Sequence, residues 1–220
     1  MPAKNTVKTF VENSYYHVYN RGVEKRSILM DEQDCVVFLY YLKMYLRPIE
    51  ELKKEIIIGA KLRFLKLNMS EEVDLLAFAL MPNHIHLLLK QRTADGITKL
   101  MRRVITAYVM YFNKKHKRVG SLFQNIYKAH QVDNDPYLLH LSRYIHLNSR
   151  KTNSMINFVE FSSYPYYLGK RSATWIKPQE ILSYFNKSND KFSYKDFVEE
   201  YVKDFPIGFE DLTLEDVCVE

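Results

Sequence analysis

Residues 75–89 read LLAFALMPNHIHLLL, two apolar runs joined by Pro82 and Asn83. This dipeptide favours a tight turn, so the stretch predicts two neighbouring strands of a buried sheet. Residues i and i+2 of a strand point to the same face, so His84 and His86 should project side by side. Two such imidazoles can clamp a metal ion, or they can be half-buried histidines with backbone partners. The spacing alone leaves both interpretations open.

Length and composition limit the class of protein. The chain has 220 residues, enough for one full domain with an appendage or for two small domains, and 47% of them are hydrophobic. Only Cys35 and Cys218 are cysteines, which argues against a disulfide framework and for a reducing compartment. We see no secretory signal and no apolar run of roughly 20 residues. The expectation is a soluble cytoplasmic protein.

The charge is unevenly distributed along the chain. Residues 199–220 contain eight acids and one base, Lys203, whereas residues 1–198 contain 31 bases and 18 acids, a balance of +13. A basic body with an acidic tail suggests a polyanionic partner, although a solvated lysine-rich surface would have the same composition.

Periodicity and turn signals predict an α+β fold. In chain order, we expect first a strand over 15–20 and a helix from Asp31 to about Tyr45. An ambiguous segment over 49–70, with a possible short strand at 56–58, leads to strands over 74–80 and 84–90. A helix from about Asp95 to Asn113, a strand or extended loop over 121–132, and a helix over 135–148 with Asp135 at its cap complete the order. This order fits an antiparallel four-stranded sheet with helices on one face, followed by one additional helix.

The chain is expected to divide near residue 150. Residues 1–150 would form the catalytic domain and residues 151–220 a C-terminal helical appendage with an acidic tail. Within the appendage we expect an aromatic loop over 161–167, a short helix over 179–185 and a final helix starting at Ser193.

The predicted helix over 135–148 carries two further candidate residues. The amide oxygen of Asn148 could join His84 and His86 in a three-ligand metal site with open positions, which suits polarisation of a substrate oxygen. Tyr144 lies one helical turn earlier and could attack phosphorus, given a nearby cation that favours phenolate. With 17 tyrosines in the chain, a core-facing aromatic is the simpler interpretation of Tyr144 from these residues alone.

Several basic residues are candidates for contacts with the phosphates of a polyanionic partner. The cluster over 114–118 is either a helix end that complements the helix dipole or a phosphate-binding element. The candidates are Arg21, Arg102, Arg103, Lys114, Lys115, Lys117, Arg118, Lys128 and Arg143.

A set of short motifs gives the chain a recognisable identity. They are Tyr16-His17-Val18-Tyr19-Asn20-Arg21-Gly22, the stretch from Ala77 to His86, Gly120-Ser121-Leu122-Phe123-Gln124 with Tyr127-Lys128, Tyr144-Ile145-His146-Leu147-Asn148, and Phe161-Ser162-Ser163-Tyr164. Together, over about residues 14–168, the chain resembles the single-tyrosine HUH transposases, most closely their REP-associated branch. Where that branch usually has proline after the asparagine, this chain has Ser149.

The resemblance implies a fold and a chemistry. It implies a ferredoxin/RRM-like sheet, His84 and His86 as the HUH pair, Tyr144 as nucleophile and Asn148 as the third metal ligand. It further implies Mg²⁺ or Mn²⁺ as cofactor, single-stranded DNA near hairpins as substrate, a covalent link to a 5′ phosphate, and a monomer or homodimer.

Two other functions fit parts of the sequence. A non-catalytic single-stranded nucleic-acid binding module could stack bases on tyrosines of the sheet. A relaxase-type nickase would use the same chemistry, but relaxases usually carry a longer histidine cluster than this chain has. Metal dependence separates the binding module from either enzyme.

Overall fold

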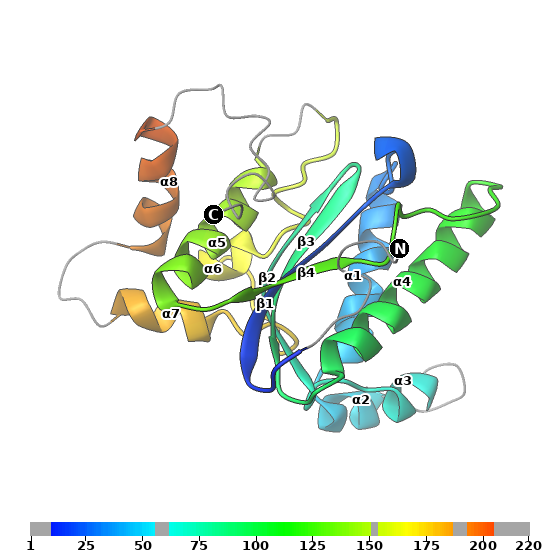
Figure 1. Ribbon diagram of the computed structural model, residues 1–220, viewed down its shortest axis with the longest axis horizontal. Coiled ribbons are helices and arrows are strands. Elements are labelled where there is room, and N and C mark those ends of the chain that lie inside the picture. The colour runs from blue at the N-terminus through cyan, green and yellow to red at the C-terminus, as the bar shows by residue number, and fades with distance from the viewer. Residues whose placement is uncertain (1–9, 56–61, 151–153, 187–192, 205–220) are drawn as a thin grey trace, which may run out of the picture.

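A four-stranded sheet lies between two layers of helices. The structure is a computed structural model that describes residues 10–55, 62–150, 154–186 and 193–204. Helices α1 (Glu32–Leu46) and α4 (Gly96–Lys115) lie on one side of the sheet, and α5 (Asp135–Asn148), α6 (Tyr164–Tyr167), α7 (Gln179–Asn186) and α8 (Tyr194–Asp204) lie on the other (Figure 1). None of the described helices is both long and apolar enough to cross a membrane.

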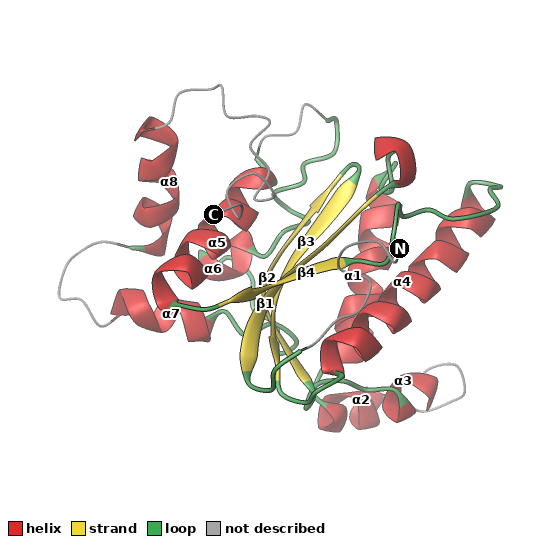
Figure 2. Cartoon of the chain, viewed as in Figure 1, coloured by secondary structure: helices red, strands yellow, loops and turns green. Residues whose placement is uncertain are grey.

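The sheet has the strand order of a ferredoxin-like fold. Its strands are β1 (Ser14–Arg21), β2 (Val73–Met81), β3 (His84–Gln91) and β4 (Lys128–Val132), arranged β2-β3-β1-β4 with every neighbouring pair antiparallel. With α1 between β1 and β2, and α4 between β3 and β4, the predicted α+β fold is confirmed (Figure 2). The fourth strand is shorter than the expected segment, because residues 121–127 form a loop.

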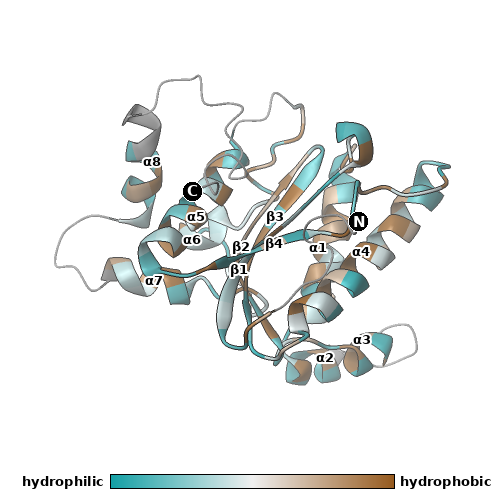
Figure 3. Ribbon diagram, in the orientation of Figure 1, coloured by the Kyte–Doolittle hydropathy of each residue, from teal (hydrophilic) through white to brown (hydrophobic). Residues whose placement is uncertain are grey.

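The face covered by α1 and α4 contains the larger core. Phe38 of α1, Tyr108 of α4 and Ile85 of β3 are fully buried there. Helix α4 alternates hydrophobic and hydrophilic bands, as an amphipathic surface helix should (Figure 3). Two short helices, α2 (Ile49–Glu55) and α3 (Leu62–Lys66), occupy the ambiguous segment, and the possible strand at 56–58 lies outside the described residues.

The second face of the sheet is covered by α5 and by the segment that follows it. Ala79 forms an isolated bridge with Ser162, and the amide of Leu80 donates to the carbonyl of Phe161. The chain after residue 153 therefore packs directly on the edge strand β2. The expected aromatic loop there contains a one-turn helix, α6, with Pro165 in its first turn.

A buried hydrogen-bond network joins this covering layer to the sheet. His146 of α5 is completely buried, with its Nδ1 2.7 Å from the Tyr194 hydroxyl of α8 and its Nε2 2.6 Å from Ser163 Oγ. Ser163 Oγ in turn accepts from the backbone amide of Phe78 in β2 at 2.8 Å. Because both ring nitrogens are bonded, the network fixes the rotation of α5 about its own axis.

The cap of α5 differs from the sequence-based expectation, and the start of α4 has no side-chain cap. Helix α5 is capped by Asn134, whose side chain accepts from the amide of Tyr137 at 2.8 Å, and Asp135 is its first helical residue. Asp95 precedes α4 but makes no capping bond, because its carboxylate pairs with Lys99 at 2.8 Å. Both asparagine and aspartate are good caps, so propensity could not separate the neighbours.

Candidate active site

The hairpin between β2 and β3 presents the two histidines on the face that α5 covers. His84 pairs with Met81 and His86 with Ala79, while Ile85 points into the core on the opposite face. The turn is held by the end of β1, since the amide of Gly22 donates to the carbonyl of Asn83 at 2.8 Å. A Cβ at Gly22 would lie 2.2 Å from the backbone oxygen of Arg26, so a larger residue could not occupy this position without moving the chain.

His86 is buried and uses only one of its ring nitrogens. Its Nδ1 lies 2.7 Å from Nε2 of His17, a buried residue of β1. Its Nε2 is also buried, yet it has no hydrogen-bond partner within the described parts of the chain. Buried polar atoms are rarely left without a hydrogen-bond partner, so His86 Nε2 is a candidate atom for binding a ligand.

His84 is half-buried at the start of β3 and has a defined orientation. Its Nδ1 is 2.6 Å from Oδ1 of Asn83, an oxygen that can only accept. The proton therefore sits on Nδ1, which leaves the Nε2 lone pair available for a ligand.

The histidines of the site are neutral at neutral pH. Burial lowers the pKa of His84 to about 4, with a smaller contribution from the positive charge of Arg21. Burial likewise lowers the pKa of His17 to about 3 and holds the pKa of His86 well below its usual value. Metal ions bind neutral imidazole, so the environment favours the ligating form.

Helix α5 brings Tyr144 to the same place. The Tyr144 ring is half-buried, with its centroid 5.7 Å from that of His86 and 6.4 Å from that of His17, nearly perpendicular to both. Asn148 follows one turn later, and its buried Nδ2 has no hydrogen-bond partner among the described residues. The sequence-predicted histidines and tyrosine are thus brought together, on α5 and β3.

The donors at this site fit a divalent cation with open coordination positions. His86 Nε2 is unpartnered, and His84 Nε2 is the free nitrogen of a ring fixed by Asn83. Across the described ranges, no group of three or more His, Cys, Asp or Glu side chains is arranged to hold a metal. A site completed by an amide and by substrate or water oxygens needs no such group.

The basic candidates fall into two groups. Arg21 is the cross-strand neighbour of His84, and Lys128 lies with its ammonium 5.6 Å from the Tyr19 ring centre on the same face as the histidines. The others lie on α4, in the turn after it, or on α5. Of these, Arg102, Lys114 and Lys117 are exposed, Arg118 donates to Asn113, Lys115 pairs with Asp31 and Asp34, Arg103 donates to the Leu67 carbonyl, and Arg143 packs on the Phe197 ring.

Tyr127 and Tyr137 are alternative candidates for the nucleophile. Tyr127 is buried in the core beneath α1 and α4, and its hydroxyl is 3.2 Å from Thr98 of α4. Tyr137 lies in the first turn of α5, two turns before Tyr144. Neither forms a ring contact with His86 among those the structure describes.

Sequence reasoning did not assign roles to His17 or His146. His17 shares one face of β1 with Tyr15 and Tyr19, and this could be inferred from the sequence. Its position beside His86, however, depends on how β1 and β3 are aligned. His146 gave no local signal, because its partners come from segments 17 and 48 residues away.

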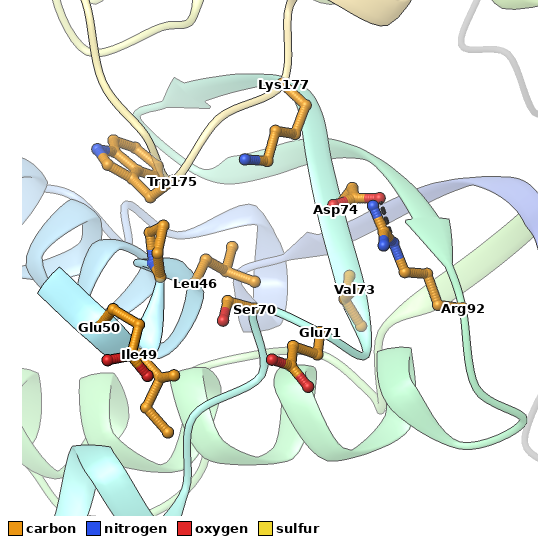
Figure 4. Close-up of a pocket in the computed structure, with 11 residues that line it drawn as sticks. Leu46, Ile49, Glu50, Ser70, Glu71, Val73, Asp74, Arg92, Trp175 and Lys177 are labelled. Atoms are coloured by element: carbon orange, nitrogen blue, oxygen red, sulfur yellow. Dashed lines mark hydrogen bonds and ion pairs between the residues drawn. The ribbon is translucent and has the colours of Figure 1, made fainter. Parts of the chain in front are cut away.

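A recess of about 280 Å³ lies away from this site (Figure 4). Its wall includes Trp175, Lys177 and the ion pair between Asp74 and Arg92, whose oxygen and nitrogen are 2.7 Å apart. Asp74 is at the start of β2, the end of the hairpin opposite His84, so the recess does not contribute to the candidate site.

A comparison with models of protein families matches the part of the chain that contains the candidate site. A family model described as "Transposase IS200 like" matches residues 47–148. No sequence among the curated proteins matches the chain.

Two solved structures resemble the fold. "Structure of the REP associates tyrosine transposase bound to a REP hairpin" is 15% identical, covers 78% of this chain and 90% of that one, and has a TM-score of 0.48. A putative transposase from Deinococcus radiodurans R1 is 16% identical, with 64% and 95% covered and a TM-score of 0.37. Both TM-scores lie below 0.5, so neither likeness bears on the assignment.

Proposed function

We propose that the chain is an IS200-like transposase, since the model of that family matches residues 47–148, and that it cleaves and rejoins single-stranded DNA. The reaction is metal-dependent and proceeds through a 5′-phosphotyrosine on Tyr144. The observation that carries the proposal is the buried, unpartnered Nε2 of His86 beside the Tyr144 ring.

The metal-binding residues are His84, His86 and Asn148. A divalent cation bound there would polarise a non-bridging oxygen of the scissile phosphate and favour the phenolate of Tyr144. Two imidazoles and one amide form a softer donor set than Mg²⁺ prefers, so we expect Mn²⁺ to bind more tightly than Mg²⁺.

Tyr144 supplies the nucleophile. Its phenolic oxygen forms a bond to phosphorus while the bond from phosphorus to the 3′ oxygen breaks. The phenol loses one proton and the departing 3′ oxygen gains one, so no water is consumed. Because the phosphotyrosine ester retains the energy of the phosphodiester, a 3′ hydroxyl can reverse the reaction and join strands without ATP.

The hydrogen bonds that hold α5 in place support the assignment of Tyr144 as the nucleophile. Tyr144 and Asn148 flank His146, whose two ring nitrogens are both bonded, to α8 and to the segment that packs on β2. Productive attack requires the reacting atoms to be held in a narrow range of positions, which such a network provides.

The substrate is expected to approach across the turn end of the β2–β3 hairpin. Arg21 and Lys128 border the histidines there, and both can contact phosphates. Exposed Lys114 and Lys117, in the last turn of α4 and just after it, are at the same end of the sheet, because their neighbour Lys115 pairs with Asp31 and the amide of Ile28 donates to the carbonyl of Pro82 in the hairpin turn. We therefore expect the preferred substrate to be a DNA hairpin with a single-stranded flank.

The test is capture of the covalent intermediate. Each variant is incubated with labelled single-stranded hairpin DNA and Mn²⁺ and separated on denaturing gels. Tyr144→Phe should retain DNA binding but carry no label, whereas Tyr127→Phe and Tyr137→Phe should be labelled like the wild type.

Three outcomes would contradict the proposal. A labelled Tyr144→Phe protein would exclude this tyrosine as the nucleophile. Metal-independent DNA binding, with no label on any variant or on the wild type, would favour the non-catalytic binding module. Undiminished labelling in His84→Ala or His86→Ala would remove the metal clamp from the mechanism.

A further inference from the structure

The contact between His17 and His86 has the geometry of an in-plane hydrogen bond. The two ring planes are inclined by only 13°, and the nitrogens are 2.7 Å apart. Stacked rings at van der Waals separation could not bring their nitrogens so close. The centroid separation of 5.0 Å is what two coplanar rings joined edge to edge would give.

The strand pairing makes this contact possible. In the register between β1 and β3, His86 is opposite Tyr19 and His17 is opposite Leu88, so the two histidines are diagonal neighbours on one face. Both are buried, so water cannot replace either partner. His130 of β4 is opposite His17 on the other side and bonds to the Tyr19 hydroxyl at 3.2 Å.

The bond determines which nitrogen of His86 carries hydrogen. A neutral imidazole has one donor nitrogen and one acceptor nitrogen. If His86 Nδ1 donates to His17, then Nε2 has its lone pair free, and that atom is the one left without a partner. The opposite arrangement would place an N–H on buried Nε2 with nothing to receive it, which is costly.

We infer that His17 is a positioning residue for the metal site: its Nε2 accepts the Nδ1 hydrogen of His86, which fixes the His86 ring and directs its Nε2 lone pair toward the cation. This inference rests on the proposed function for the identity of the ligand. Partners of this kind typically contribute 10- to 100-fold, roughly, to metal affinity.

Two substitutions at His17 separate positioning from packing. His17→Phe fills a similar volume but cannot accept a hydrogen bond. In His17→Gln, the amide oxygen can lie near the position of Nε2 and accept the hydrogen bond from His86. We expect Mn²⁺ affinity, measured by calorimetry, to fall about 10- to 100-fold in His17→Phe and to be largely retained in His17→Gln. His130→Phe is the matched control, because it removes a neighbouring histidine of the same face that lies on β4, with β1 between it and the strand of His86.

A spectroscopic measurement needs neither metal nor a folded variant. Nitrogen chemical shifts of His86 in the metal-free wild type should show hydrogen on Nδ1 and none on Nε2. Hydrogen on Nε2 would overturn the inference, as would a folded His17→Phe protein that binds Mn²⁺ like the wild type.

The results that would contradict the role of His17 differ from those that would contradict the proposed function. If His86→Ala lowers Mn²⁺ affinity but His17→Phe does not, the metal site stands and the positioning role is wrong. If the wild type itself binds no Mn²⁺, the proposed function fails, while the tautomer measurement still decides the role of the hydrogen bond.

Discussion

Acidification should destabilise the fold through His146, which is completely buried between α5, α8 and the segment bonded to β2. Burial lowers its pKa to about 3, from an ordinary value of 6.5 in the unfolded chain. Between these values the unfolded state binds more protons than the folded state. The stabilising contribution is therefore complete above pH 6.5 and is lost as the pH falls below it.

The size of the effect follows from proton linkage. Between pH 7.0 and pH 5.5 the loss is about 1.3 kcal/mol for one histidine that remains neutral in the folded state. His17 is equally buried, with a pKa also lowered to about 3, and should contribute a similar amount. These two residues alone should therefore lower the free energy of unfolding by roughly 2–3 kcal/mol over this interval.

Urea unfolding at the two pH values measures the effect directly. Trp175 is the single tryptophan, is buried and lies against Phe78, so its fluorescence reports loss of the tertiary structure. His146→Gln should be less stable at pH 7.0, since its bonds to Tyr194 and Ser163 are altered, but its pH dependence should be smaller by about 1.3 kcal/mol. His140→Gln, on the same helix, is the comparison: partial burial also lowers the pKa of His140, but less than that of His146, so this substitution should reduce the pH dependence by a smaller amount.

An unchanged pH dependence in His146→Gln would refute this reasoning. It would mean either that His146 is protonated in the folded state or that its surroundings are open to water. The comparison uses differences between variants above pH 5, where most carboxylates remain ionised in both states.

Three further predictions concern DNA binding. Arg21→Gln should weaken binding and reduce the salt slope by about one unit, because its guanidinium is beside His84 at the proposed phosphate site; an unchanged slope in filter-binding titrations would place the phosphates elsewhere. Joint charge removal at exposed Lys114 and Lys117 should flatten the slope by about two units, and Lys115 is left intact because it pairs with Asp31. Deleting residues 207–220, which lie outside the described structure, should tighten binding at low salt if the acidic tail competes with DNA, whereas equal affinity would assign the tail to solubility.

The sequence determined the hairpin and the common face of its histidines by itself. Both depend on local rules: Pro82 and Asn83 favour a turn, and alternation along a strand puts His84 and His86 on one side. The helix over 135–148 and the spacing of Tyr144 and Asn148 were likewise readable, because neighbours on a helix face are set by its repeat. Its exact cap was not, because adjacent Asn134 and Asp135 have similar capping propensity.

Only the tertiary structure decided how these pieces meet. The approach of the Tyr144 ring to His86 depends on how α5 packs on the sheet, and that packing is fixed by His146 and by partners far along the chain. The bond between His86 and His17 depends on the register of β1 and β3, two strands that are separated by 62 residues, Gly22 to Asn83, which include β2. Which basic residues are committed to the protein itself, as Lys115 is, also follows from packing. A sequence carries residue types and local periods, whereas register and docking are set by the burial of whole faces and by hydrogen bonds between distant segments.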